Sequence, residues 1–239
     1  MALQQEMVKQ GNFLFRYRGI LPLLIVIPAL FLRKFGIDSD SLAANATTTS
    51  YLAYGIALIG LCLRFIVVGH AAPNTSGRNT QGQIADTINS DGLYSIVRHP
   101  LYLGNFLMWL GPALLTFHYW FIVAFILLYW IYYERIMLAE EDYLRNKFGK
   151  PYEDWAAGRP AFIPDLAKWK PYENKMLFYK AIYQEKTGFL WLNLIFWLFN
   201  ILNAESINIA FSLTTPWTAL LLFAIILYAI LKLTKRQSR

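Results

Sequence analysis

Long runs of apolar residues, separated by polar segments, divide the chain into pieces of membrane-helix length. The six runs are residues 17–32, 50–69, 101–117, 119–137, 189–202 and 209–231. A helix that spans a bilayer needs about 20 predominantly apolar residues, with a range of about 17–25. The pattern therefore predicts an all-α, polytopic membrane protein with about six transmembrane helices.

Three of these runs have features of their own. Only His118 separates the third run from the fourth, so we expect them to form an antiparallel helical hairpin. The first run is short and contains two prolines, and a cleaved signal peptide is an alternative interpretation of it. The small-residue segment 44–46 would serve as the cleavage site, but it lies far beyond the Arg33-Lys34 pair that ends the run. We therefore expect the run to remain as a span.

The basic residues are distributed unevenly around the six runs. They gather before the first run, between the second and third, between the fourth and fifth, and after the sixth. Six spans place all four groups on one side of the membrane and leave only Arg33 and Lys34 on the other. Cytoplasmic loops carry the excess of Lys and Arg, so we expect both termini and the long loops to be cytoplasmic.

Composition supports this class and excludes others. Hydrophobic residues make up 56% of the 239 residues and charged residues only 15%, whereas soluble domains have about 45–50% and about 25%. A single cysteine, Cys62, permits neither an internal disulfide nor a multi-cysteine zinc site, and the three histidines are too scattered for a metal site. The net charge of +7 does not indicate nucleic-acid binding, because the aromatic residues lie in the apolar runs rather than among the basic residues.

Two polar segments, residues 71–98 and 139–187, are long enough to be functional. They divide the chain into N-terminal membrane helices (1–70), a central core with the hairpin and both polar segments (71–187), and two C-terminal membrane helices with a basic tail (188–239). No dinucleotide-binding glycine motif, P-loop or hydrolase nucleophile motif is present.

The densest group of chemically useful residues lies where the first polar segment enters the hairpin. Pro100 suits the first turn of a helix, whose free N–H groups attract anions, and Arg98 adds a fixed cation. Gly104 allows close approach of a helix or a ligand. The alternative is a membrane-edge arginine with a helix-starting proline and a packing glycine.

An acidic pair, Glu140-Glu141, stands at the cytoplasmic end of the second hairpin helix. Because the hairpin reverses the chain, this pair is expected to return close to Arg98 and His99. It could bind ribose hydroxyls or an ammonium group, or it could be a solvated acidic turn.

Three motifs occur in one order: R-H-P-x-Y-x-G at 98–104, E-E-x-x-L at 140–144 and F-G-x-x-Y at 148–152. Together they resemble the isoprenylcysteine carboxyl methyltransferase family and its phospholipid methyltransferase relatives, over roughly residues 90–165. The resemblance implies an integral membrane enzyme that binds S-adenosylmethionine in a cytoplasm-facing pocket. It is strongest to bacterial members, which implies a bacterial inner membrane.

The resemblance also assigns roles to residues. The expected cofactor contacts are His99, Pro100, Tyr102, Gly104, Glu140 and Glu141. Arg98 and Arg159 are expected to act in catalysis by facing the acceptor's anionic group, and Tyr152 and Trp155 to bind the acceptor. Apart from the resemblance, Arg64 is expected to bind the acceptor because it is a charged residue within an apolar run. Trp155 stands where a tyrosine is common in the family. For Arg64, snorkelling to the membrane surface is the alternative to lining the acceptor path.

The expected reaction is O-methylation of a carboxylate or phosphate on a lipidic or prenylated acceptor. An anionic oxygen needs no strong general base, whereas an amine must lose a proton. The arginine pair therefore favours this acceptor over a phospholipid amine, whose N-methylation is the first alternative. A non-catalytic membrane scaffold or transporter, and an NADPH-dependent sterol-reductase-like relative, remain further alternatives. The expected partners are the acceptor and membrane lipids, with no nucleic acid.

Overall fold

The computed structural model describes residues 2–19, 23–35, 45–72, 75, 83–203 and 215–237. Its regular elements in these ranges are all helices: α1 (Ala2–Tyr17), α2 (Leu23–Phe35), α3 (Ala46–His70), α4 (Leu93–Ile96), α5 (Pro100–Leu114), α6 (Tyr119–Phe148), α7 (Lys150–Ala157), η2 (Leu166–Lys168), α8 (Phe178–Asn203) and α10 (Pro216–Gln237). The predicted all-α class is confirmed. Residue 44 of the possible cleavage site lies outside the described residues.

Within the described ranges, three helices are long and apolar enough to cross a membrane: α3, α6 and the Pro216–Thr234 part of α10. Helix length and composition therefore do not confirm the predicted count of about six spans. The first predicted span, residues 17–32, is not one helix, since α1 ends at Tyr17 and α2 begins at Leu23. The predicted hairpin forms from α5 and α6, with residues 115–118 between them.

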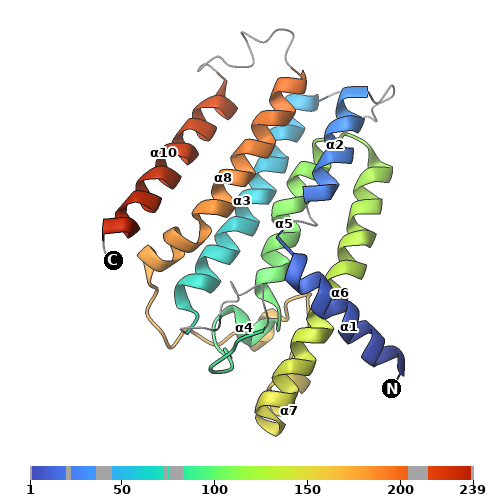
Figure 1. Ribbon diagram of the computed structural model, residues 1–239, viewed down its shortest axis with the longest axis vertical. Coiled ribbons are helices and arrows are strands. Elements are labelled where there is room, and N and C mark those ends of the chain that lie inside the picture. Colours follow the sequence, from blue (N-terminus) through green and yellow to red (C-terminus); the bar gives the residue numbers. More distant parts are fainter. Residues whose placement is uncertain are drawn as a thin grey trace.

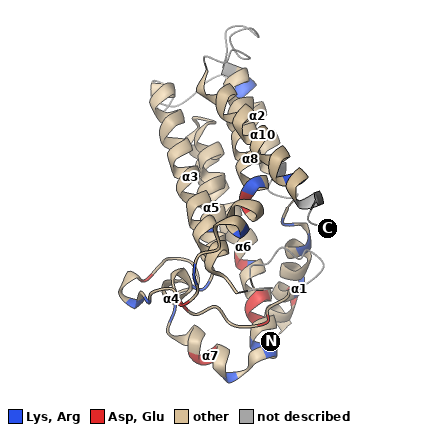
Figure 2. Cartoon of the chain, turned by 90° about the vertical axis from the view of Figure 1, so that its left-hand side faces the viewer, with Lys and Arg blue, Asp and Glu red and all other residues tan. Residues whose placement is uncertain are grey.

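The helices stand side by side along the long axis of the molecule (Figure 1). α8 packs between α10 and α3, α3 packs on α5, and α1 crosses the lower part of α6. Acidic and basic residues gather toward the end that carries α1, α4 and α7, whereas few of the residues drawn in colour at the opposite end are charged (Figure 2). This separation agrees with the predicted cytoplasmic placement of the polar segments, which stays a prediction.

Small residues allow α3 and α5 to pack closely. A Cβ atom on Gly104 would lie 2.7 Å from Arg64 Cγ and 2.9 Å from the Gly60 carbonyl oxygen. One on Gly111 would lie 2.7 Å from the Ala53 carbonyl oxygen. Helices in membranes associate through such small-residue contacts, because lipid tails give no hydrophobic drive for association. Gly104 therefore has a packing role at this crossing.

Tyrosines fill the space between α5 and α6. The Tyr129 and Tyr133 rings stack with centroids 4.2 Å apart, and the Tyr129 hydroxyl donates a hydrogen bond of 2.6 Å to the Tyr102 carbonyl. Buried tyrosines need such partners for their hydroxyls. The stack fixes the hairpin and places Tyr102 at the charged end of the bundle.

Candidate active site

The start of α5 carries the first functional residues, and a distant part of the chain holds it in place. Pro100 occupies the first turn of the helix, where its missing N–H costs nothing. The backbone N–H groups of Arg98 and His99 donate to the carbonyls of Pro160 and Ala161, at 2.9 and 3.2 Å. The segment after α7 thus satisfies buried backbone donors that the helix cannot satisfy itself.

A glycine turn directs α7 toward this region. Gly149 ends α6 with φ +60° and ψ −135°, a conformation that only glycine adopts readily. α7 then begins with Pro151 in its first turn and contributes Tyr152 and Trp155. The F-G-x-x-Y motif is therefore a helix end, a turn and the first inward-facing side chain of the next helix.

The acidic pair of α6 meets the start of α5, as predicted. His99 Nε2 lies 3.0 Å from Glu141 Oε1, and His99 Nδ1 lies 3.6 Å from a Glu140 oxygen. The Tyr102 hydroxyl donates to Glu140 at 2.7 Å. Burial opposes protonation of His99, but the hydrogen bonds and negative charges of the two glutamates outweigh it and raise the pKa of His99. The cluster therefore favours an imidazolium between two carboxylates.

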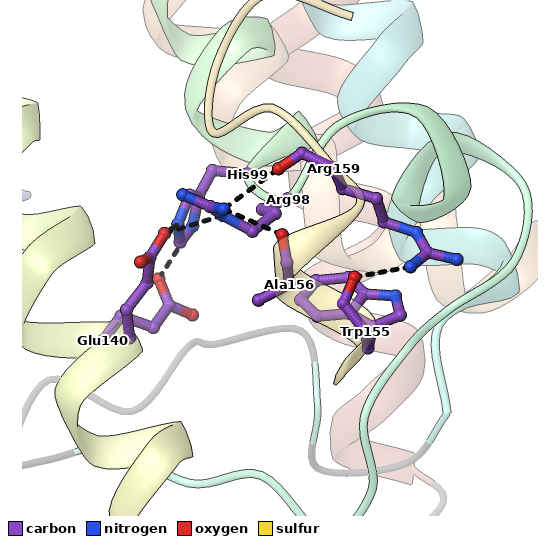
Figure 3. A network of polar contacts seen from close by, with 7 residues as sticks. Arg98, His99, Glu140, Trp155, Ala156 and Arg159 are labelled. Atoms are coloured by element: carbon purple, nitrogen blue, oxygen red, sulfur yellow. Dashed lines mark hydrogen bonds and ion pairs between the residues drawn. The ribbon is translucent and has the colours of Figure 1, made fainter. Parts of the chain in front are cut away.

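Arg98 joins this cluster, whereas the Arg159 side chain does not (Figure 3). Arg98 Nε forms an ion pair of 2.9 Å with Glu141, and its Nη1 donates to the carbonyls of Ala156 and Arg159 at 3.0 and 2.9 Å. The Arg159 guanidinium points away, donates to the Trp155 carbonyl and lies 5.3 Å from the Trp155 ring centroid. Of Arg159, the backbone carbonyl contacts Arg98, and the guanidinium does not reach the cluster.

A cavity of about 690 Å³ opens beside the cluster, a size typical of small-molecule sites. Arg98, His99, Tyr102, Glu140, Tyr152 and Trp155 line its polar end. The remaining residues expected to contact the cofactor or acceptor at this end do not line the cavity: Pro100, Gly104, Glu141 and Arg159.

Several cavity-lining side chains bury polar atoms that have no hydrogen-bond partner among the described residues. The Tyr152 hydroxyl and Trp155 Nε1 are two of them, both at the polar end. Tyr152 is only 1% exposed. Buried polar groups are nearly always paired, so each such exception calls for an explanation, and a ligand in the cavity supplies one.

Arg64 is paired inside the bundle. Its guanidinium donates two hydrogen bonds to the Glu185 carboxylate, at 2.8 and 2.9 Å, and a third of 2.7 Å to Asn105 Oδ1. Arg64 lines the cavity, and its partners come from α8 and α5. A lateral ion pair, rather than snorkelling to the surface, therefore accommodates this charge.

Comparison with known proteins matches the part of the chain that carries Arg98, His99, Glu140 and Glu141. The isoprenylcysteine carboxyl methyltransferase (ICMT) family matches residues 51–146, a segment that holds most of α3, all of α4 and α5, and most of α6. This segment of the chain is similar to the family, and the match covers less than half of the chain. No solved structure matches it.

Relatives named as O-methyltransferases agree with the family match, and one relative has a different name. A protein-S-isoprenylcysteine O-methyltransferase of Schizosaccharomyces pombe is 36% identical over 75 residues, which cover 31% of this chain and 32% of that protein. Protein-S-isoprenylcysteine O-methyltransferase B of Arabidopsis thaliana is 33% identical over 76 residues, or 31% and 38% of the two chains. The cobalt-zinc-cadmium resistance protein CzcN of Cupriavidus metallidurans is 27% identical over 159 residues, or 66% and 69%. The matches thus span about a third of the two O-methyltransferases.

The part of the chain outside the ICMT segment also contributes to the site. Tyr152 and Trp155 on α7 line the cavity, and so do several residues of α8, including Glu185. Glu185 and Asn105 were not anticipated from the sequence. A lone arginine within an apolar run does call for an acidic or amide partner, and that signal could have prompted a search for one.

Proposed function

We propose that the chain is an integral membrane enzyme that transfers a methyl group from S-adenosylmethionine to an anionic oxygen of a lipidic or prenylated acceptor. The observation that carries this proposal is the cluster of Arg98, His99, Glu140 and Glu141 at the mouth of a cavity that continues into an apolar bundle. The family match over residues 51–146 supports it, as do relatives named protein-S-isoprenylcysteine O-methyltransferases. We place the mouth on the cytoplasmic side, because the charged end of the bundle carries it.

The polar end of the cavity fits such a cofactor. S-adenosylmethionine presents a sulfonium, an ammonium and ribose hydroxyls, and Glu140 offers a carboxylate to these groups. The unpartnered Tyr152 hydroxyl and Trp155 Nε1 would gain partners from its polar atoms. His99 and Tyr102 would hold the Glu140 carboxylate in position, and Glu141 would hold His99 and Arg98. When bound, the cofactor supplies an electrophilic methyl group.

Alignment is then the main contribution of the protein. Fixing two reactants in line is worth about 7–11 kcal/mol in model reactions. An acceptor carboxylate or phosphate is already ionised and needs no base. Glu140 accepts from Tyr102, and Glu141 is paired with Arg98 and His99, so both carboxylates are engaged by protein donors. This favours an anionic oxygen over an amine, which would need a free base.

The two arginines take different parts in this proposal. Arg98 lines the cavity and is placed to attract the acceptor's anion, with Glu141 and two carbonyls fixing its guanidinium. Arg159 turns away from the cluster, so we assign it the positioning of Trp155 rather than contact with the acceptor.

Methyl transfer tests this function directly. Purified protein in detergent receives methyl-tritiated S-adenosylmethionine and either N-acetyl-S-farnesyl-cysteine or a bacterial membrane lipid extract, followed by organic extraction. Binding of S-adenosylmethionine is measured separately. Glu141→Gln is compared with Glu134→Gln, which alters an exposed glutamate on the same helix whose ion-pair partner among the described residues is the neighbouring Arg135.

We expect label in the organic phase for the wild type, loss of at least about tenfold in Glu141→Gln, and retention in Glu134→Gln. Base-labile label released as methanol identifies a carboxyl ester. Base-stable label directs the assignment to a phosphodiester or an amine. Absence of both transfer and cofactor binding in the wild type would overturn the proposed function.

A further inference from the structure

Helix α8 forms one wall of the cavity although it lies outside the segment that matches the family. The match ends at residue 146, and α8 runs from Phe178 to Asn203. Its cavity-lining residues include Glu185, Gly188, Trp191 and Ile195, which recur at helical spacing on one face. The shape of the inner cavity therefore depends on an element that the family match does not include.

The cavity changes character along α8. At the level of Glu185, the ion pair with Arg64 and the hydrogen bond from Arg64 to Asn105 form a polar layer without net charge, which links α8, α3 and α5. Beyond this layer the wall is apolar and aromatic, from Met108 and Trp109 on α5 to Trp191, Leu192 and Ile195 on α8. This end suits an uncharged apolar chain, because any polar group there would lose its water without gaining a partner.

Gly188 lies where the polar layer gives way to the apolar end. A Cβ atom on Gly188 would lie 3.3 Å from Glu185 Oε2, 3.5 Å from Met108 Cε and 3.7 Å from Leu61 Cδ1. All three neighbours are ends of side chains, so the backbone permits a side chain here. A large side chain at this position would occupy the cavity itself, which Gly188 lines.

We infer that α8 sets the length of the apolar chain that the acceptor can carry, and that Gly188 leaves the space through which this chain passes Met108. The inference rests on the proposed function and adds a specificity-determining residue to it. It assigns the mouth of the cavity to the reacting groups and the inner end, between α5 and α8, to the acceptor's hydrocarbon.

Gly188→Leu tests the inference, with Gly55→Leu as the matched control. Gly55 is also a glycine within a long helix, α3, and a Cβ there would meet nothing within 4 Å. Both changes replace glycine with a strong helix former, so their effects on helix propensity are equal. The acceptors are the N-acetyl-cysteine thioethers of geranyl, farnesyl and geranylgeranyl, which differ only in chain length.

We expect Gly188→Leu to lower the ratio of kcat/KM for the geranylgeranyl acceptor to that for the geranyl acceptor by about tenfold or more, the scale on which apolar pockets discriminate size. Gly55→Leu should keep the wild-type ratio. Photo-crosslinking with a farnesyl diazirine probe, without cofactor, should label α8 peptides in the wild type and less in Gly188→Leu. Gly188→Ala, a smaller change, should shift the ratio in the same direction if the leucine variant does not fold.

The outcomes separate the two proposals. Wild-type transfer with an unchanged chain-length ratio in both Gly188 variants would overturn the role of α8 while the proposed function stands. A wild type that binds no cofactor and methylates none of the three acceptors would overturn the proposed function, and this inference with it.

Discussion

Replacing Glu185 by glutamine should destabilise the bundle, because it leaves a buried guanidinium without its counter-charge. The Glu185 carboxylate accepts two hydrogen bonds from Arg64, and the two side chains are only 5% and 21% exposed. Hydrogen bonds to charged groups contribute about 1.5–3 kcal/mol each. Removing one partner of a buried ion pair costs about 3–5 kcal/mol. Glutamine keeps one acceptor oxygen, and Asn105 remains bound, so we expect the lower end, about 3 kcal/mol.

The assay is thermal unfolding in detergent, followed by tryptophan fluorescence. For a chain of about this size, 1 kcal/mol shifts Tm by about 2–4 °C, so Glu185→Gln should lower Tm by about 6–12 °C. The double variant Arg64→Met/Glu185→Met supplies the control, since apolar residues of similar volume often replace a buried ion pair without loss. It should recover most of the stability. A Tm for Glu185→Gln within about 2 °C of the wild type, or a double variant at least as unstable as Glu185→Gln, would refute the reasoning.

Three further outcomes follow from local geometry. Gly104→Ala should lower stability by about 1–3 kcal/mol, because its Cβ would press on the Gly60 carbonyl oxygen, whereas Gly55→Ala should not lower it; Tm measures both. Gly149→Ala should lower Tm by straining a φ of +60°, at a cost of about 1–3 kcal/mol. Protonated His99 stabilises the fold, and this contribution is fully present below the ordinary histidine pKa of about 6.5. It is lost as the pH rises through the raised pKa of His99. Tm should therefore fall between these two pKa values in the wild type, and less in His99→Gln.

Periodicity and motif order predicted the helical class, the α5–α6 hairpin and the meeting of Glu140 and Glu141 with Arg98 and His99. A hairpin necessarily returns the chain to its starting level, so these contacts follow from topology alone. Side-chain direction does not follow in this way. The sequence identified Arg159, but whether its guanidinium or its carbonyl faces Arg98 depends on how the segment after α7 packs.

The course of α8 was also beyond the hydropathy pattern. The apolar run begins at residue 189, but the helix begins at Phe178, because charged residues before the run find partners within the bundle. Lys180 donates to the Ala71 carbonyl at 2.6 Å, Glu185 pairs with Arg64, and Lys186 lies over the Tyr183 ring. A hydropathy plot assigns such residues to a loop, because it contains no information on contacts between residues that are distant in sequence.

The backbone hydrogen bonds between the start of α5 and the segment after α7 determine when the site can form during synthesis. Arg98 and His99 leave the ribosome long before Pro160 and Ala161, whose carbonyls accept their backbone N–H groups. The hairpin can therefore enter the membrane before the backbone at its cytoplasmic entrance has its partners. The nascent chain holds an incomplete site until the segment beyond α7 is made, and a chain stopped before residue 160 would keep the motif residues of the hairpin without the contacts that hold the entrance of α5 in place.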